Sequence, residues 1–489
     1  MLVLLIVNFY TTRVVLQSLG VDDFGLYNVV AGFVALIGFI NQSMTNSIQR
    51  YLNFAMGKKS VELLRTYFSS AVYVQAIIAA IVFILAEIVG VWCINNVLNI
   101  PAYKYVAANI VFQISIISFV FKILETPFVA VIISHEKMDI YAIVSLVEGA
   151  MQLAIAFFIN YIAFYRLEFY SLMLLILTII LSIVYLVYSK KIATFKFSLI
   201  KFDKNVVKNI LSFSGWNLFG TISSTIKTQG INILMNLFFG VAVNAARGVA
   251  YQVLSGCLKF TSNFQMAVNP QIVKSFSAQE KSRYLHLTYM NGKASFFLMW
   301  LLVLPLSINI KEILCLWLGN GCVPEYTEIF IVLVLFTGLI DSLGSAISVS
   351  IYATGRIKFY QIIVSTITLL VLPISYIFYK IGYAPETSMY ISLGLSFAAQ
   401  SARVAIWSNL IKEPIVNYLH FVVLPIVVTI VISYGIAYLI DTIFTTNSIL
   451  SIVLIITINL ITIWLVGLDK NTRTSIKKAI ISKLHTNGK

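Results

Sequence analysis

The sequence predicts an all-α polytopic membrane protein with about 14 transmembrane helices, arranged as two six-helix lobes plus two extra C-terminal helices. Three observations support this prediction. Hydrophobic residues make up 60% of the chain, only 11% of residues are charged, and the mean hydropathy is +0.92, which is typical of membrane proteins. Apolar runs of about 20 residues, the length that spans a bilayer, follow one another throughout the chain. A pattern in the first half of the chain also recurs in the second half.

Fourteen segments are long and apolar enough to cross the membrane. The loops between them are too short to fold as soluble domains. The first segment has no polar stretch before it and no small-residue cleavage site, which favours a retained helix over a signal peptide. The predicted segments are 1–19, 25–48, 67–94, 104–130, 139–163, 168–188, 210–238, 244–272, 286–309, 327–352, 358–380, 387–410, 419–440 and 447–467.

An internal repeat predicts how the lobes are related. Gly20 and Gly240 lie in the similar runs LGV and FGV, and Lys137 matches Arg356 at nearly the same shift along the chain. Both shifts move the pattern by six helices, and an even number preserves orientation in the membrane. We therefore expect two lobes related by a pseudo-twofold axis along the membrane normal. The predicted parts are an N-terminal lobe at 1–190, a cytoplasmic linker at 191–209, a C-terminal lobe at 210–412, two further helices at 413–468 and a basic cytoplasmic tail at 469–489.

The lysines and arginines predict the orientation of the chain. With a cytoplasmic N-terminus, 23 of the 34 lie in inward-facing loops and the C-terminal tail, and four lie in outward-facing loops. This bias is a strong positive-inside signal, so we expect both termini in the cytoplasm. It also explains most of the net charge of +15, and no nucleic-acid partner is needed to account for it.

Two predicted helices, the second and the eighth, carry polar side chains at membrane depth. Lipid cannot satisfy such groups, which are therefore expected to face other helices or a water-filled cavity. Their amide and hydroxyl groups suit hydrogen bonding to a polar substrate. The candidate cavity residues are Asn41, Thr45, Asn46, Asn263 and Gln265.

Seven basic residues lie inside predicted membrane segments. Lys227 and Lys259 are about 22–26 Å from the starts of their helices, at a rise of about 1.5 Å per residue. At that depth they reach water only through an internal cavity, which makes them candidate ligands for an anionic substrate. The alternative is a buried ion pair with Glu87, Glu148 or Asp341. The seven are Arg13, Lys122, Lys227, Arg247, Lys259, Lys293 and Arg403.

Four of these bases lie closer to a membrane surface. Arg13 and Arg247 are near the outer ends of their helices, and either snorkel to the outer surface or join the anionic site. Lys293 and Arg403 lie nearer the cytoplasmic ends of theirs. Snorkelling is the expected behaviour of this second pair.

Intramembrane acids raise the question of energy coupling. Glu87, Glu148 and Asp341 have no obvious partner nearby in the sequence, and such groups often mark proton or sodium pathways. The alternative is a structural pair with a buried cation. Glu125 lies one turn from Lys122, so an i,i+3 ion pair is predicted there.

The sequence contains no pattern for metal or cofactor binding. The four cysteines and four histidines are scattered without metal-ligand spacing, and the glycines form no phosphate-binding or dinucleotide-binding motif. We therefore predict no metal site and no cofactor.

Two runs of sequence resemble a known family. The run TTRVVLQSLGVDDFGLYNVVAGFVALIGFINQSMTNSIQRYLNFAMGKK, which begins at Thr11, and the run ISHEKMDIYAIVSLVE, which begins at Ile133, are similar to bacterial oligosaccharide flippases of O-antigen and capsular repeat units. These flippases belong to the multidrug/oligosaccharidyl-lipid/polysaccharide exporter superfamily. The resemblance extends over essentially the whole chain. The sequence departs from the family in one respect: family members usually carry a short basic segment before the first helix, and this sequence does not show one.

The resemblance implies a function. In that family two lobes form a V around a central cavity, and alternating access moves an undecaprenyl-diphosphate-linked oligosaccharide from the inner to the outer leaflet of the bacterial plasma membrane. It favours Arg13 and Arg247 as diphosphate ligands, because their helices line the cavity in the family. They join Lys227 and Lys259 in that role. The implied partners are the lipid-linked oligosaccharide, membrane lipids, a polysaccharide polymerase and glycosyltransferases, and a monomer is expected.

Two alternative functions are weighed against a flippase. A cation-coupled multidrug exporter of the same superfamily should have a cavity dominated by acids, whereas seven intramembrane bases stand against four acids here. A membrane polysaccharide polymerase or ligase needs a large outer loop with catalytic side chains. The longest outer loop, Asn309 to Tyr326, is short and has no histidine, so no enzyme is predicted.

Overall fold

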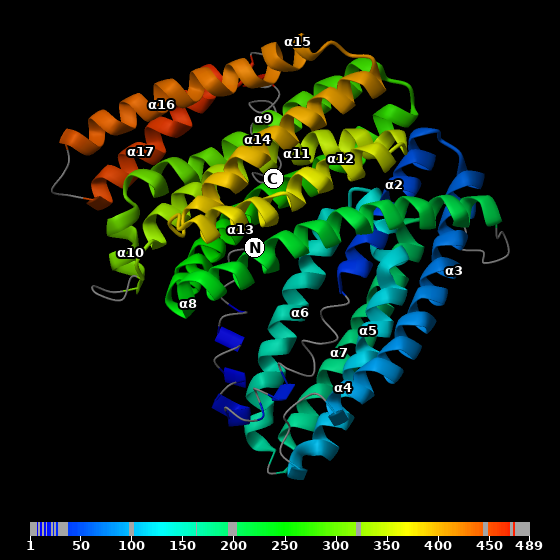
Figure 1. Ribbon diagram of the computed structural model, residues 1–489. Coiled ribbons are helices and arrows are strands. Elements are labelled where there is room, and N and C mark those ends of the chain that lie inside the picture. Colours follow the sequence, from blue (N-terminus) through cyan, green and yellow to red (C-terminus); the bar gives the residue numbers. More distant parts are fainter. Residues whose placement is uncertain are drawn as a thin grey trace, which may run out of the picture. The chain divides into compact units, whose positions relative to one another are not determined.

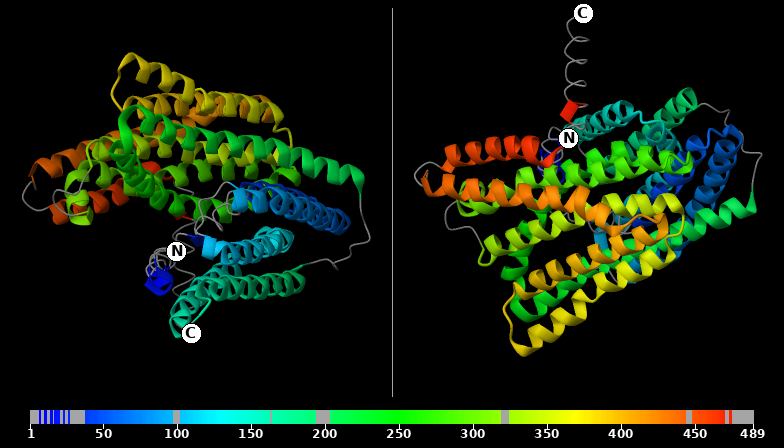
Figure 2. Two further views of the ribbon diagram at one scale, coloured as in Figure 1. Left: turned by 60° about the horizontal axis from the view of Figure 1, so that its bottom comes forward. Right: turned by 90° about the horizontal axis from the view of Figure 1, so that it is seen from above.

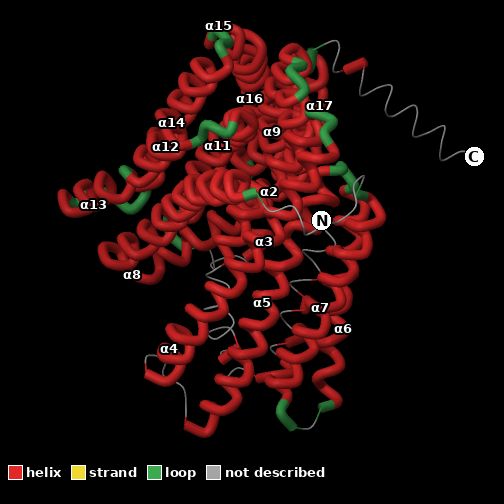
Figure 3. The backbone as a smooth tube through the Cα atoms, turned by 90° about the vertical axis from the view of Figure 1, so that its right-hand side faces the viewer, coloured by secondary structure: helices red, strands yellow, loops and turns green. Residues whose placement is uncertain are grey.

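The computed structural model describes residues 7, 10–11, 14–15, 17–20, 23, 26–27, 38–96, 102–162, 164–193, 203–318, 324–443, 448–469 and 473–474. Across these residues the regular secondary structure is entirely helical, with short connecting loops (Figure 3). The chain divides into two compact units, here called unit 1 (Met1–Leu218) and unit 2 (Phe219–Lys489). The predicted lobe boundaries, which lie close to this division, remain a prediction.

Unit 1 is built around α5, which packs against α7, α3 and α2 (Figure 1). Its core includes Phe68, Phe112 and Ile116, each almost fully buried. The helix α3 continues through a π-turn, η1, into α4. The elements are α2 (Gly38–Gly57), α3 (Val61–Leu85), η1 (Ala86–Gly90), α4 (Val91–Asn96), η2 (Ala102–Lys104), α5 (Tyr105–Ser134), α6 (Met138–Phe158), η3 (Ile159–Tyr161), α7 (Arg166–Ile192) and the start of α8.

Unit 2 is centred on α11, which packs against α9 and α14. The last two long helices, α16 and α17, lie beside each other and against α9 (Figure 2). The elements are the rest of α8 (Lys204–Ser277), then α9 (Lys281–Ile308), α10 (Ile310–Leu318), α11 (Thr327–Thr354), α12 (Lys358–Leu369), α13 (Val371–Ile381), α14 (Thr387–Ile411), α15 (Ile415–Tyr418), η4 (Leu419–Val423), α16 (Leu424–Ile443), α17 (Ser448–Thr462) and η5 (Ile463–Gly467).

The long element α8 is two helices that meet at Gly240. Its backbone there has φ 82° and ψ −172°, a conformation that only glycine adopts without strain. Gly20, its match in the repeat, has φ 81°. A Cβ at either glycine would meet no atom within 4 Å, so both positions require glycine for the backbone angle and not for space.

Other left-handed residues repeat in the same way. Lys59 and Gln279, related by the same shift as Gly20 and Gly240, have φ values of 52° and 62°. Glu136 and Gly355, related by the same shift as Lys137 and Arg356, have φ values of 61° and 78°. The repeat seen in the sequence is therefore present in the backbone of both units.

Each of the fourteen predicted segments contains residues that the structure places in a helix, which confirms the all-α polytopic fold. Nine helices in the described part of the chain are apolar and long enough to cross a membrane. Three other long helices, α2, α8 and α14, are not among the nine. These three carry many of the polar residues considered below.

Candidate functional site

A group of charges lies between α11 and α14 in unit 2. The Arg403 guanidinium on α14 is 3.7 Å from the Asp341 carboxylate on α11. The Arg403 side chain is only 14% exposed, and Asp341 is 44% exposed. Two buried nitrogens of Arg403, Nε and Nη1, have no hydrogen-bond partner among the described residues. The prediction that Arg403 snorkels to the membrane surface is therefore wrong. Its Nε and Nη1 are hydrogen-bond donors without a partner among the described residues, next to a partly accessible carboxylate.

Gly344 makes room for Arg403. A Cβ at this position of α11 would lie 2.4 Å from Nη1 of Arg403 and 2.8 Å from Oε1 of Gln400. Such distances are far inside van der Waals contact, so a larger residue would displace the guanidinium. The glycine one turn after Asp341 therefore determines where Arg403 lies.

Lys227 belongs to the same group of charges. It is half-buried on the first half of α8, and the charges of Asp341, Arg403 and Arg247 all act on its ammonium. The cation within 4 Å of Asp341 is Arg403 and not Lys227, so the structure shows the alternative predicted for Asp341, a pair with a buried cation, but not the pair predicted as the alternative for Lys227. We call Lys227, Arg247, Asp341 and Arg403 the unit 2 cluster, which holds three cations and one acid, and in which Arg403 and Asp341 lie within ion-pair distance.

The Arg247 side chain makes its hydrogen bonds within α8. Its side chain donates to Oδ1 of Asn232 and, at 3.1 Å, to the carbonyl oxygen of Thr228. The guanidinium also lies 4.2 Å from the ring centroid of Tyr251, and the residue is only 2% exposed. Arg247 therefore does not snorkel to a surface, and it links the two halves of α8 across Gly240.

Lys259 lies on an exposed polar face in the second half of α8. Gln252, Ser255, Lys259 and Ser262 are all exposed, and their spacing of three and four residues places them on one side of the helix. Lipid cannot satisfy such groups at membrane depth, so this face is expected to meet water. Asn263 is half-buried beside it.

Gln265 lies on the opposite, buried side of α8. Its Nε2 donates to Oγ of Ser295 at 2.9 Å and to the carbonyl oxygen of Ser342 at 3.3 Å, and its Oε1 accepts from Ser345 at 2.8 Å. The prediction that Gln265 contacts a substrate is not supported, because its polar atoms already hold α8 to α9 and α11.

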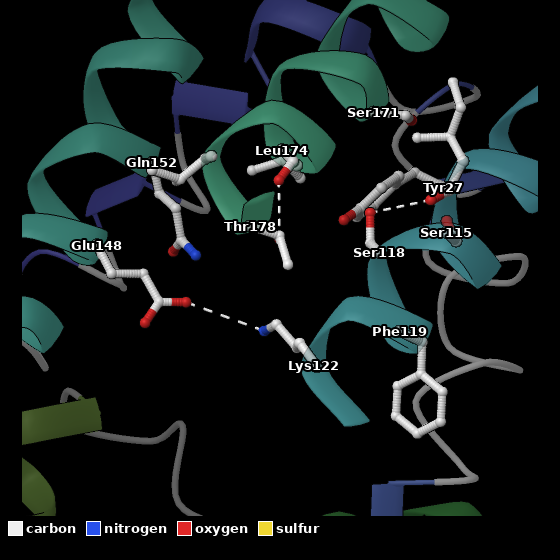
Figure 4. Close-up of a pocket in the computed structure, with 12 residues that line it drawn as sticks. Tyr27, Ser115, Ser118, Phe119, Lys122, Glu148, Gln152, Ser171, Leu174 and Thr178 are labelled. Carbon is white, nitrogen blue, oxygen red and sulfur yellow. Dashed lines mark hydrogen bonds and ion pairs between the residues drawn. The ribbon is translucent and has the colours of Figure 1, made fainter. Parts of the chain in front are cut away.

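A polar cavity of about 220 Å³ lies among α5, α6 and α7 in unit 1. Lys122 and Glu148 point toward each other in it, 3.9 Å apart, from α5 and α6 (Figure 4). The predicted pairing of Lys122 with Glu125 is therefore wrong, since Glu125 instead accepts a 2.7 Å hydrogen bond from Ser182 on α7. The other polar residues of the cavity are Tyr27, Ser115, Ser118, Gln152, Ser171 and Thr178.

The polar residues of α2 lie next to this part of unit 1. Asn41 accepts a 2.6 Å hydrogen bond from Thr126 and donates to the carbonyl oxygen of Lys122 at 3.4 Å. Thr45 donates to the carbonyl oxygen of Asn41, one turn earlier in the same helix, and Asn46 is half-buried. Asn41 thus links α2 to α5 at the level of Lys122.

Glu87 lies in the π-turn that follows α3. Its Oε2 accepts a 2.9 Å hydrogen bond from Gln113 on α5. Its Oε1 is buried and has no hydrogen-bond partner among the described residues. Of the remaining predicted site residues, Arg13 lies outside the described residues.

Sequence reasoning missed several residues of these two regions. Ser115, Ser118 and Lys122 follow a helical spacing on α5, a signal that identifies a polar face in retrospect. Gln152 on α6 follows Glu148 by one turn and gives the same signal. Arg403 was visible in the sequence, but its proximity to Asp341 depends on how α14 packs against α11.

Comparisons with known proteins agree with this architecture. No protein-family model and no curated protein matches the sequence. Among solved structures, a MOP superfamily transporter from Pyrococcus furiosus, described as having a binding pocket of reverse polarity that suggests a different function, has a TM-score of 0.71 at 11% identity. That match covers 83% of this chain and 92% of the other.

Two further structures are similar to the same degree. An outward-facing multidrug resistance MATE family transporter of the MOP superfamily has a TM-score of 0.70 at 11% identity, covering 83% of this chain and 92% of the other. A MATE protein in complex with MaD3S has a TM-score of 0.68 at 11% identity, covering 84% and 93%. At such identity the likeness establishes the fold alone: this chain is a multi-pass membrane protein with the fold of MOP superfamily transporters.

Proposed function

We propose that this protein moves an undecaprenyl-diphosphate-linked oligosaccharide from the inner to the outer leaflet of a bacterial plasma membrane by alternating access, for the synthesis of cell-surface polysaccharide. The observation that carries the proposal is the excess of positive charge in the unit 2 cluster. A diphosphate headgroup cannot cross hydrocarbon unaided, because the free energy needed to take its charge out of water is far larger than the free energy by which the lipid tail is stabilised in the bilayer. Cations held at membrane depth supply the missing partners.

Lys227 and Arg403 are the diphosphate ligands in this proposal. A guanidinium binds phosphate oxygens through paired hydrogen bonds, and an ammonium acts as a point charge. The 3.7 Å separation between Arg403 and Asp341 is longer than a hydrogen bond. Exchanging Asp341 for a phosphate therefore breaks no hydrogen bond between Arg403 and Asp341.

Asp341 acts as the internal competitor of the cargo. Its carboxylate neutralises part of the cluster when no cargo is bound and favours release when the cargo must leave. This role replaces a simple ion-coupling site at Asp341. Glu87 and Glu148 remain the proposed acids for coupling to an ion gradient. The alternative energy source is the membrane potential, which supplies about 2.3 kcal/mol for each charge that moves through 100 mV.

The sugar chain is proposed to contact the accessible polar groups. Lys259 and its neighbours Gln252 and Ser255 form an exposed face on α8 that suits hydroxyl groups. Asn41, Thr45, Asn46 and Asn263 are the other proposed contacts. The lipid tail stays in the bilayer throughout, so no covalent bond changes and no cofactor is required.

The proposed setting follows from the charge bias of the loops. Both termini lie in the cytoplasm, and the protein works as a monomer beside the glycosyltransferases that make its cargo and the polymerase that consumes it. Labelling of engineered cysteines in the loops of intact cells tests the orientation.

A transport assay tests the function. Purified protein is reconstituted in vesicles, and a diphosphate-linked oligosaccharide is followed across the bilayer for wild type, Lys227→Ala, Arg403→Ala and Lys259→Ala. A surface substitution, Lys190→Ala, is the matched control because Lys190 is exposed at the end of α7. Slower translocation in the three variants supports the proposal, and wild-type rates in Lys227→Ala and Arg403→Ala would remove those residues from the site.

A multidrug exporter is the second candidate. It is favoured by Glu87, whose buried Oε1 lacks a hydrogen-bond partner among the described residues and suits a transported or coupling cation. The same vesicles distinguish the two functions. Uptake of an organic cation that is abolished by Glu87→Gln, with no movement of the diphosphate substrate, would establish export of cations instead.

A further inference from the structure

A second cavity in unit 2 lies apart from the cluster. It has a volume of about 730 Å³ and is lined by the first half of α9, by Glu413 and residues within 420–425, and by residues 466–469 and Arg473. The positive-inside bias assigns this end of the three segments to the cytoplasmic face. The cavity therefore lies between α9, which belongs to the repeated part of the chain, and the ends of the last two helices, α16 and α17.

The acids that line this cavity are already paired. Asp469 pairs with Lys293, which is only 8% exposed. Glu413 pairs with Lys281 at 3.3 Å and accepts a 2.7 Å hydrogen bond from Asn417. Lys293 thus extends toward the helix end as predicted, but it meets an acid there instead of water.

The remaining polar lining consists of Ser282, Tyr289 and three basic residues. Arg473 donates from Nε and Nη2 to the carbonyl oxygens of Leu468 and Leu465, which leaves Nη1 available among the described residues. His286 and His420 also line the cavity, and both are exposed. With both acids neutralised by lysines, Arg473 and the two imidazoles give the cavity an uncompensated set of hydrogen-bond donors.

The inner part of the cavity is apolar. Met290, Leu424, Pro425 and Val466 line it. Leu424, Pro425 and Val466 lie deeper along their helices than the polar lining residues of the same segments, and Met290 lies deeper than His286, while the still deeper Lys293 is paired with Asp469. Two π-turns, η4 and η5, border the cavity, and such turns are frequent at functional sites. A basic rim above an apolar floor at a membrane surface matches one amphiphile, a lipid with a phosphate headgroup.

We propose that this cavity binds one anionic phospholipid of the cytoplasmic leaflet, with its phosphate against Arg473, His286 and His420 and an acyl chain over Leu424 and Val466. Basic pockets between helices on the cytoplasmic side are suited to such headgroups. The bound lipid would fill the junction between α9 and the α16–α17 pair. This proposal stands whether the transported substrate is a lipid-linked oligosaccharide or a drug.

Lipid binding to the full-length protein in detergent tests the proposal. Native mass spectrometry measures retention of phosphatidylglycerol and of phosphatidylcholine, with inorganic phosphate as a separate competitor. We expect preferential retention of phosphatidylglycerol, and about a fivefold loss of affinity in Arg473→Gln, as for one cation near a headgroup. Because Arg473 also caps a helix end, the double variant His286→Ala/His420→Ala gives an independent readout with the same expected direction.

Two more variants separate the possible outcomes. Leu424→Trp fills the apolar floor and is expected to reduce lipid retention without removing a charge, whereas Lys190→Gln/Lys191→Gln, at the end of α7, should leave it unchanged. Equal retention of both lipids, or wild-type retention in Arg473→Gln and in the histidine double variant, would overturn the proposal. Competition by millimolar inorganic phosphate together with no effect of Leu424→Trp would show a free-anion site and also overturn it.

Discussion

The polar cavity of unit 1 and the cluster of unit 2 occupy related places in the repeat but carry different charge. Lys122 on α5 corresponds to Asp341 on α11 under the same shift that relates Lys137 to Arg356. A base in unit 1 thus corresponds to an acid in unit 2. Among the described residues Lys122 forms an ion pair with Glu148 and also lies near the Glu125 carboxylate, whereas Asp341 pairs with Arg403 and also acts on Lys227.

The same shift explains where Arg403 fits. Glu125 on α5 corresponds to Gly344 on α11. Glu125 fills its position and binds Ser182, while Gly344 leaves the space that Arg403 occupies. A duplicated scaffold has therefore produced a region with one base and two acids in one unit and an electropositive region with three bases and one acid in the other. We assign cargo binding to the electropositive region.

The largest expected effect is on transport by cluster variants. Arg403→Ala and Lys227→Ala should each slow translocation of the diphosphate substrate about 10- to 100-fold, as expected for losing one charge-assisted hydrogen bond of about 1.5–3 kcal/mol. Lys122→Ala, which removes a cation already balanced by Glu148, should change the rate less than about threefold. Vesicle assays with matched protein amounts provide the comparison. If Lys122→Ala were the most damaging of the three, the roles of the two regions would be reversed.

Arg247→Ala should act on stability instead of binding. Removing the guanidinium leaves the half-buried Oδ1 of Asn232 without this donor and takes one hydrogen bond from the Thr228 carbonyl, which should lower stability by about 2 kcal/mol. Reversible unfolding in detergent and SDS measures this change. The protein that remains folded should translocate at nearly the wild-type rate. A large loss of transport without loss of stability would instead place Arg247 among the cargo ligands.

Gly344→Ala tests whether the space beside Asp341 matters. The new methyl group would displace the Arg403 guanidinium, and we expect about a tenfold loss of transport, comparable to misplacing one charged donor. Gly394→Ala on α14 is the control, because a Cβ there meets no atom within 4 Å. Equal rates for both variants would mean that the position of Arg403 is unimportant.

The smallest effect concerns the repeated helix break. Gly20→Ala and Gly240→Ala should each cost about 1 kcal/mol of stability, because an alanine Cβ is strained in the left-handed region. Gly248→Ala, in a helix with free space around it, should be neutral or slightly stabilising. Unfolding transitions of the three variants provide the measurement. Unequal costs at the first two positions would argue that the units diverged in backbone as well as in charge.

Much of the fold could be predicted from the sequence. Lengths of apolar runs located the helices, because a bilayer requires about 20 residues per crossing. The glycines at 20 and 240 marked matching helix breaks, since a left-handed backbone leaves a clear sequence signal. Depth along a helix also singled out Lys227, which the structure places half-buried near Asp341 and Arg403.

The candidate site was predicted less completely. Helical periodicity gives the depth and face of a residue, but it does not say which neighbouring helix that face meets. The predicted partner of Lys122 was therefore wrong, the hydrogen bonds from Gln265 to α9 and α11 were not foreseen, and the pairing of Arg403 with Asp341 was missed. Each of these depends on contacts between helices far apart in the sequence.

The most direct test of the central claim is headgroup discrimination in binding. The protein in nanodiscs is titrated with undecaprenyl diphosphate, with uncharged undecaprenol and with an organic cation, in wild type and in Arg403→Ala. We predict that wild type binds the diphosphate at least about tenfold more tightly than undecaprenol, a preference equal to one charge-assisted hydrogen bond, and that Arg403→Ala loses most of it. Equal affinity for both lipids, or a preference for the organic cation that Arg403→Ala leaves intact, would contradict the account.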